Sequence, residues 1–146
     1  MKKILTVLSI LLMVASMASA SQVRETLIAS TTLDADPTSV TGSVNIGEAE
    51  RVAFFVTYDE TEVGGGLSVA ITMDVSYDGT TWLDASFYDY AGGATLQTSE
   101  TISADGSYYC WFNPDMAIPQ VRMVITATGS DADDTADVVA YIVMDK

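Results

Sequence analysis

The residues of this chain that are best suited to hold a ligand are aromatic. Trp82 closes the stretch SYDGTTW, and a second cluster, YYCWF, runs from Tyr108 to Phe112. A flat ring can stack on a sugar, and an exposed tryptophan is an effective anchor for another protein. The rings that could form such a surface are Trp82, Trp111, Tyr88, Tyr90 and Tyr109. For Trp82 the alternative is a packing role across the corner or along a sheet edge.

Asp78-Gly79 is a tight-turn signal between two segments with strand character. Tight hairpin turns require positive φ, which glycine adopts without steric cost. The sequence therefore predicts a structural corner at Asp78 and Gly79. We expect Trp82 to point outward or to cover the sheet edge, because it has the opposite parity to the expected core positions Leu83, Ala85 and Phe87.

An acidic run, SDADDTAD, occupies residues 130–137. Calcium prefers several carboxylate oxygens from a flexible loop, so this run could bind it. The run lacks the spacing of an EF-hand loop and its closing glutamate, and the alternative is a solvated turn between strands. The candidate calcium ligands are Asp131, Asp133, Asp134 and Asp137.

Catalytic residues are scarce. The chain has no histidine, which removes the most frequent general base and the most frequent transition-metal ligand. Its single cysteine, Cys110, cannot form a disulfide within the chain and is expected to be a buried apolar residue, with an intermolecular disulfide as the alternative. No carboxylate pair can be singled out as a glycosidase pair. We therefore expect a protein that is not an enzyme, with no cofactor other than calcium.

The first residues have the pattern of a secretory signal peptide. Lys2 and Lys3 precede an apolar run from Ile4 to Ala15, and Ala18-Ser19-Ala20 is a cleavage site. The apolar run is short for a membrane span. Ser21 stands where a lipoprotein would need a cysteine. These features predict a signal peptide over residues 1–20 and a secreted, extracellular or cell-surface protein without a membrane anchor.

The charge is strongly acidic. Six basic residues face 20 acidic ones, a net charge of −14, and removal of Lys2 and Lys3 leaves four basic residues and a net charge of −16. Such a surface repels nucleic acid and anionic lipid headgroups. We therefore expect no nucleic-acid partner.

The remaining sequence predicts β-strands throughout. From Leu67 to Tyr77, six apolar residues alternate with small or polar ones, which indicates one buried and one solvated face. We expect Val69, Ile71, Met73 and Val75 to be buried, with Thr72 and Asp74 facing outward. Similar runs occupy residues 51–58, 81–88, 121–127 and 138–144.

The run Val138–Met144 is apolar on both faces, which is typical of a central strand. Turn signals such as Asn113-Pro114 separate the runs. Together they predict an all-β fold: a single antiparallel, jelly-roll-like β-sandwich of about 8–9 strands over residues 21–146.

The stretch SYDGTTW (Ser76–Trp82) resembles the S-x-D-G-x-x-W hairpin of jelly-roll and related β-sandwich families. These include phage virion decoration or tail-associated proteins and, more distantly, discoidin-like carbohydrate-binding modules. The stretch from Ile118 to Met144 is similar to the C-terminal strand pair of the phage-type sandwiches. The resemblance implies a β-sandwich. Because virion proteins need no export signal, the predicted signal peptide favours a cell-surface or extracellular relative.

Two functions fit these features. The first is an exported, non-enzymatic structural or interaction protein, a subunit of a layer, appendage or filament that associates with itself or with other surface proteins. In this interpretation the segment Ser21–Leu33 could pair with a neighbour's sheet edge or be an ordinary first strand. The alternative is a secreted carbohydrate-binding module that holds a glycan on surface aromatic residues. Exposed coplanar rings beside polar groups would favour the glycan.

Overall fold

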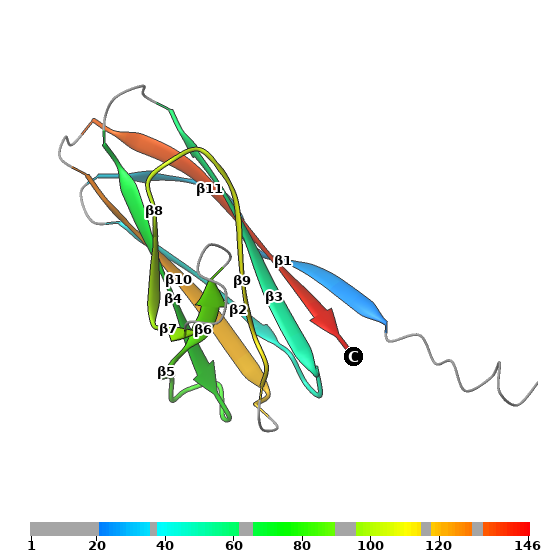
Figure 1. The fold of residues 1–146 in the computed structure, drawn as a ribbon. Helices are drawn as coiled ribbons and strands as arrows, with labels where there is room; N and C mark the ends of the chain where they lie inside the picture. The colour runs from blue at the N-terminus through cyan, green and yellow to red at the C-terminus, as the bar shows by residue number, and fades with distance from the viewer. Residues whose placement is uncertain (1–20, 36–37, 62–65, 90–95, 115–117, 130–132) are drawn as a thin grey trace, which may run out of the picture.

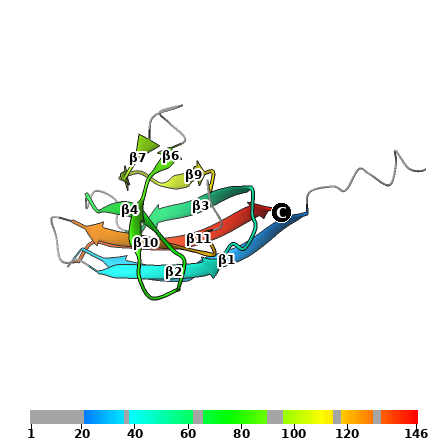
Figure 2. The ribbon, with the colours of Figure 1, turned by 90° about the horizontal axis from the view of Figure 1, so that it is seen from below.

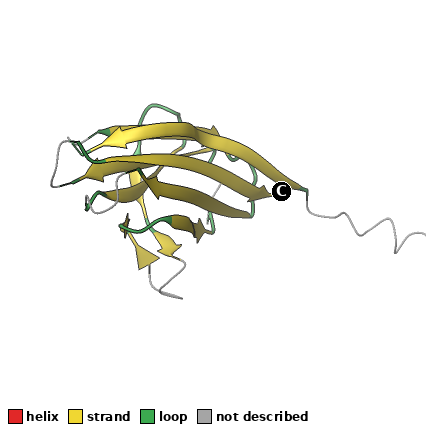
Figure 3. Cartoon of the chain, turned by 90° about the horizontal axis from the view of Figure 1, so that it is seen from above, coloured by secondary structure: helices red, strands yellow, loops and turns green. Residues whose placement is uncertain are grey.

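The computed structural model describes residues 21–35, 38–61, 66–89, 96–114, 118–129 and 133–146. These residues form strands and loops (Figure 3). No helix in the described segments is long and apolar enough to cross a membrane. The eleven strands are β1 (Gln22–Asp34), β2 (Ser39–Asn45), β3 (Arg51–Glu60), β4 (Ser68–Ser76), β5 (Leu83–Ala85), β6 (Phe87–Asp89), β7 (Leu96–Gln97), β8 (Ser99–Ile102), β9 (Gly106–Phe112), β10 (Gln120–Thr128) and β11 (Thr135–Asp145).

The strands form two antiparallel sheets that face each other as a sandwich (Figures 1 and 2). The six-stranded sheet has the order β1-β11-β3-β9-β6-β7, and the five-stranded sheet has the order β2-β10-β4-β5, with β8 also paired to β4. The predicted antiparallel β-sandwich is therefore confirmed. The predicted signal peptide, residues 1–20, lies outside the described residues.

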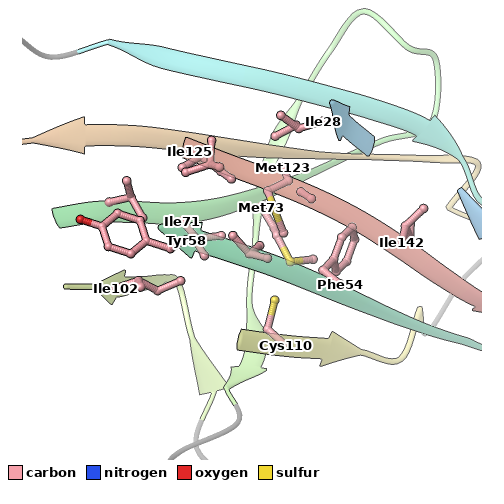
Figure 4. Packing of buried hydrophobic residues seen from close by; sticks show 14 of the residues in the cluster. Ile28, Phe54, Tyr58, Ile71, Met73, Ile102, Cys110, Met123, Ile125 and Ile142 are labelled. Carbon is pink, nitrogen blue, oxygen red and sulfur yellow. The ribbon is translucent and has the colours of Figure 1, made fainter. Parts of the chain in front are cut away.

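The core lies between the sheets, and on β3 and β10 it is built by strict alternation. On β3, Val52, Phe54, Val56 and Tyr58 are buried, and β10 buries every second residue from Val121 to Ala127. Figure 4 shows Phe54 and Tyr58 of β3 beside Ile71 and Met73 of β4 in the facing sheet. Burying one such aliphatic side chain stabilises the fold by roughly 1.5–3 kcal/mol.

The alternation on β4 is confirmed at Val69, Ile71 and Met73 and fails at the end of the strand. Val75 is half-buried, whereas Asp74, predicted to face solvent, is buried. Asp74 does face outward as predicted, opposite Arg122, but its burial was not expected, and Val75 packs against the core without being fully buried. A partner on the outer face of the sheet covers Asp74, as described below.

The predicted strand over residues 81–88 is divided between the two sheets. Residues up to Ala85 pair with β4 in the five-stranded sheet, whereas β6 begins at Phe87 and pairs with β9 in the six-stranded sheet. Leu83, an expected core position, is 60% exposed, although Phe87 is fully buried. This crossing and the short β7 explain why the described residues form eleven strands where about 8–9 were predicted.

The segment Ser21–Leu33 belongs largely to β1, which pairs with β11 of its own chain along its whole length. One side of the sandwich closes where β1 passes over β2. A Cβ atom at Gly42 would lie 2.1 Å from the Leu27 carbonyl oxygen, so glycine is required at this close approach. Two register shifts, after Thr26 and after Ile28, bend β1 at this point.

Candidate functional site

The outer face of the six-stranded sheet carries five aromatic side chains, which we call the aromatic face: Phe55, Tyr88, Tyr109, Trp111 and Tyr141. Each alternates with a buried neighbour on its strand. Phe54 points into the core, so Phe55 points out, and Cys110 in the core leaves Tyr109 and Trp111 outside.

Strand register brings these rings together in two rows across the sheet. In the first row, Tyr88 of β6 is opposite Trp111 of β9, which is opposite Ala53 of β3. In the second row, Tyr109 is opposite Phe55, which is opposite Tyr141 of β11. Residues directly opposite each other on one face have Cβ atoms roughly 4.5–5.5 Å apart, so each row is a continuous band of side chains.

The rings lie nearly flat against one another. The Tyr88 and Trp111 ring centroids are 4.4 Å apart with 21° between the ring planes, and those of Phe55 and Tyr109 are 5.8 Å apart with 30°. Phe55, Tyr109 and Trp111 are 41%, 39% and 37% exposed. So much exposed aromatic surface in one place indicates a binding surface.

Two shallow depressions run along this face and meet at Val143. The larger, about 560 Å³, has a polar wall at one end, formed by Gln22, Arg51, Asn113 and Asp145, beside Tyr109 and Trp111. The smaller, about 300 Å³, is lined by Arg24, Phe55, Thr57, Ser107, Tyr141 and Val143. Stacking surfaces beside hydroxyl, amide and guanidinium groups can bind a ligand that has both apolar faces and polar edges.

Two arginines belong to the aromatic face. The Arg24 guanidinium carbon lies 4.2 Å from the centroid of the Tyr141 ring. Arg24 and Arg51 are both exposed, and within the described part of the chain neither has a carboxylate oxygen within 4.0 Å. Their N–H groups are therefore available to a ligand.

The Asp78-Gly79 stretch forms a corner whose polar groups are hydrogen-bonded to one another. The Asp78 carboxylate accepts hydrogen bonds from the Thr80 and Thr81 backbone N–H groups at 2.8 and 2.7 Å, and the Ser76 hydroxyl oxygen accepts one from the Gly79 N–H. The bonds from the Thr81 and Thr80 backbone N–H groups, with one from the Ser76 hydroxyl, hold the pKa of Asp78 well below its usual range. Gly79 has a φ of 75°, in the left-handed region that the turn signal predicts.

Trp82 is half-buried on the outer face of the opposite, five-stranded sheet. The guanidinium carbon of Arg122 lies 4.5 Å from its ring centroid, and Arg122 Nε donates a 2.6 Å hydrogen bond to Asp74 Oδ2. The arginine is thus held between a ring and a carboxylate. This arrangement explains the burial of Asp74.

The structure divides the aromatic residues that the sequence singled out. It brings together Trp111, Tyr88 and Tyr109, places Trp82 on the other sheet, and leaves Tyr90 outside the described residues. Sequence reasoning missed Phe55 and Tyr141. A signal for Phe55 was present, since it has the opposite parity to the buried residues of β3.

The four candidate calcium ligands do not form a cluster among the described residues. Asp131 lies outside them, Asp133 is exposed, and Asp137 accepts a hydrogen bond from the Thr32 hydroxyl. Asp134 is buried, and its Oδ2 has no hydrogen-bond partner in the described part of the chain. No three Asp, Glu, Cys or His residues there lie close enough together to hold a metal ion.

Cys110 is buried and unpaired, as expected for an apolar core residue (Figure 4). Burial, followed by the nearby carboxylates of Glu100 and Asp89, raises the pKa of its thiol to about 12. The thiol is therefore protonated at neutral pH, and only the thiolate is a good nucleophile.

No protein-family model matches this chain, and no curated protein matches it in sequence. Solved structures match its fold. It is similar to the PBSX exported protein XepA, with a TM-score of 0.53, 12% identity, and coverage of 84% of this chain but 37% of that one. A putative sugar-binding protein from Bacteroides thetaiotaomicron has a TM-score of 0.49, 10% identity, and coverage of 88% and 84%. Infectious bursal disease virus VP2 has a TM-score of 0.48, 10% identity, and coverage of 85% and 32%. At 12% identity the likeness to XepA shows the fold alone.

Proposed function

We propose that this chain is an exported, non-enzymatic glycan-binding module whose ligand lies along the aromatic face. The observation that carries the proposal is the pair of ring rows on the outer face of the six-stranded sheet, centred on Phe55, Tyr109 and Trp111. Phe55, Tyr109 and Trp111 are exposed, two ring pairs pack against each other with 21° and 30° between their planes, and polar side chains border the rows. A sugar ring has an apolar C–H face and a hydroxyl edge, and this surface offers a partner for each.

Each group on this surface has a role in the proposed complex. Trp111 and Tyr109, beside the larger depression, would stack on sugar rings. Gln22 and Asn113 would exchange hydrogen bonds with hydroxyl groups at the polar end. Ser107 and Thr57 would do the same in the smaller depression. Because the face is built on paired strands, its geometry is set before the ligand arrives, which lowers the entropic cost of binding.

The test is affinity electrophoresis or calorimetry of residues 21–146 against a panel of soluble polysaccharides. We expect Trp111→Ala to weaken binding about tenfold or more, as loss of a central ring does at an interface. The matched control is Tyr77→Ala, which removes a ring that is 74% exposed and belongs to neither depression. Equal effects of the two substitutions, or no binding to any polysaccharide, would refute the proposal.

Assembly into a layer or filament is the second candidate, because β1 is a 13-residue strand at one edge of the six-stranded sheet. An unpaired edge is a template for another chain. The two register shifts in β1 reduce this capacity, since bulges twist an edge away from a neighbour. Size-exclusion chromatography and electron microscopy of the protein without glycan test this candidate: large, regular particles would support it.

A further inference from the structure

From the position of its arginines, we infer that the aromatic face selects an acidic glycan, one whose sugar units carry carboxylate groups. This inference rests on the proposed function and adds the class of ligand. Its starting point is the uneven distribution of positive charge in a very acidic protein.

After residue 20 the chain has four basic residues, namely Arg24, Arg51, Arg122 and Lys146, against 20 acidic ones. Arg122 is already bound to Asp74 on the five-stranded sheet. Arg24 and Arg51 lie on the aromatic face, and Lys146 follows directly after β11, whose Asp145 is opposite Arg51. Three of the four positive charges therefore gather at one end of one sheet.

Arg24 and Arg51 are prepared for anions in different ways. The Tyr141 ring holds the Arg24 guanidinium at 4.2 Å, which orients it without using its N–H groups. Arg51 forms part of the wall of the larger depression. A guanidinium presents a fork of N–H donors that matches the two oxygens of a carboxylate.

The two arginines are spaced along the face and do not converge on one point. Arg24 is opposite Val143, which is opposite Ala53, and Arg51 lies two residues before Ala53 on β3. Strand spacing and rise place their Cα atoms about 12 Å apart on a diagonal. Arg51 lines the larger depression and Arg24 the smaller, and two arginines in successive depressions beside stacking rings suit a chain with repeated acidic units.

The rest of the molecule makes this preference specific. Its net charge of −16 after removal of residues 1–20 repels polyanions that approach other surfaces. At about 0.1 M salt the Debye length is about 10 Å, so acidic side chains still repel a polyanion that touches them, but the net charge does not keep it from reaching the depressions. Asp145, in the larger depression, can accept hydrogen bonds from sugar hydroxyl groups.

The experiment compares polygalacturonate with its methyl ester, which has the same sugar rings without the charge, by calorimetry at 0.1 M salt. We expect the parent protein to bind polygalacturonate at least tenfold more tightly than the ester. The double variant Arg24→Gln/Arg51→Gln should lose this preference, so that it binds polygalacturonate and the ester with equal affinity. Dextran sulfate, a sulfated glycan, should bind more weakly than polygalacturonate.

The matched control is Lys146→Gln compared with Arg51→Gln, because each removes one positive charge at the same end of the sheet. Only Arg51 lies in the depression, so only Arg51→Gln should lower affinity for polygalacturonate by several-fold. Equal binding of the acid and the ester, or equal effects of the two substitutions, would overturn the inference and leave the proposed function intact. Failure to bind any glycan would overturn both. Concentration-dependent self-association that Arg24→Gln/Arg51→Gln abolishes, without glycan binding, would also overturn both and identify a second copy as the ligand.

Discussion

Two arginines of this protein lie over aromatic rings, one on each sheet, and they differ in a single partner. Arg122 lies against Trp82 and also binds the Asp74 carboxylate at 2.6 Å. Arg24 lies against Tyr141, and among the described residues no carboxylate pairs with it. The first arrangement is complete within the chain and serves the fold, whereas the second has donor groups left for a ligand.

The same contrast separates the surroundings of the two arginines. Near Trp82, the corner at Ser76–Gly79 uses its hydroxyl, carboxylate and N–H groups on itself. Near Tyr141, the aromatic face exposes Phe55, Tyr109 and Trp111. The most recognisable motif in the sequence is therefore structural, and the candidate binding face has no contiguous motif.

Removal of Arg122 should have the largest effect. Arg122→Ala leaves the Asp74 carboxylate buried without its partner, and we expect a loss of about 3 kcal/mol in the free energy of unfolding. Arg24→Ala, the matched change on the other sheet, removes an exposed cation–π contact and should cost about 0.5 kcal/mol. Urea denaturation measures both. Similar losses would show that the two arginines have the same role.

The next largest effect is expected at the corner. Gly79→Val forces a β-branched residue into the left-handed conformation, where a Cβ atom costs about 1–2 kcal/mol. Thr41→Val, on the exposed face of β2, is the control and should change stability by less than about 0.5 kcal/mol. Glycan binding should survive both changes, since neither touches the aromatic face. Loss of binding in Gly79→Val at a temperature where it is folded would connect the corner to the site.

The pH dependence of stability should show that the corner at Asp78 is sensitive to acid. The lowered pKa of Asp78 means that its bonds to Thr80 and Thr81 stabilise the fold above the ordinary aspartate range and are lost as the pH falls below it. Thermal melts from pH 5 to pH 2 should therefore show a smaller decline for Asp78→Asn than for the parent, starting from a lower melting temperature. Parallel curves would show that the corner is not the acid-sensitive element.

The pKa of Glu100 is shifted in the opposite direction to that of Asp78. Burial, together with the charge of Asp89 and a hydrogen bond to it, raises the pKa of Glu100. Protonated Glu100 therefore contributes its full stabilisation at a pH below the ordinary pKa range of glutamate. This stabilisation is lost as the pH rises through its raised pKa. Glu100→Gln should remove this loss, so its melting temperature should exceed that of the parent at pH 7 by more than at pH 4. A constant difference would contradict this.

The smallest effect concerns calcium, which would add a ligand away from the aromatic face. The buried Asp134 carboxylate has an oxygen without a hydrogen-bond partner in the described chain, and a divalent cation could coordinate that oxygen. Calcium that bound here in the folded state alone would, at millimolar concentration, raise the melting temperature by about 3 °C, or about 1 kcal/mol. Asp134→Asn should abolish the rise. An unchanged parent curve would leave the acidic run as a solvated turn.

The sequence alone determined the fold class, because alternation and turn chemistry are local properties. The period of β4 predicted its buried residues Val69 to Met73, and the Asp78-Gly79 pair predicted the left-handed conformation of Gly79. The failures at Asp74 and Leu83 have nonlocal causes. Arg122, 48 residues away, covers Asp74, and the chain leaves the five-stranded sheet two residues after Leu83.

Only the tertiary structure decided where the candidate site lies. The run Val138–Met144 is apolar on both faces, and periodicity cannot distinguish a second buried face from an exposed binding face. In the fold Ile142 is buried, whereas Tyr141 lines a depression together with Phe55, and the Arg24 guanidinium lies over the Tyr141 ring. Strand order and register join these residues from opposite ends of the chain. They depend on how the two sheets bury their shared core, and no local stretch of sequence encodes that packing.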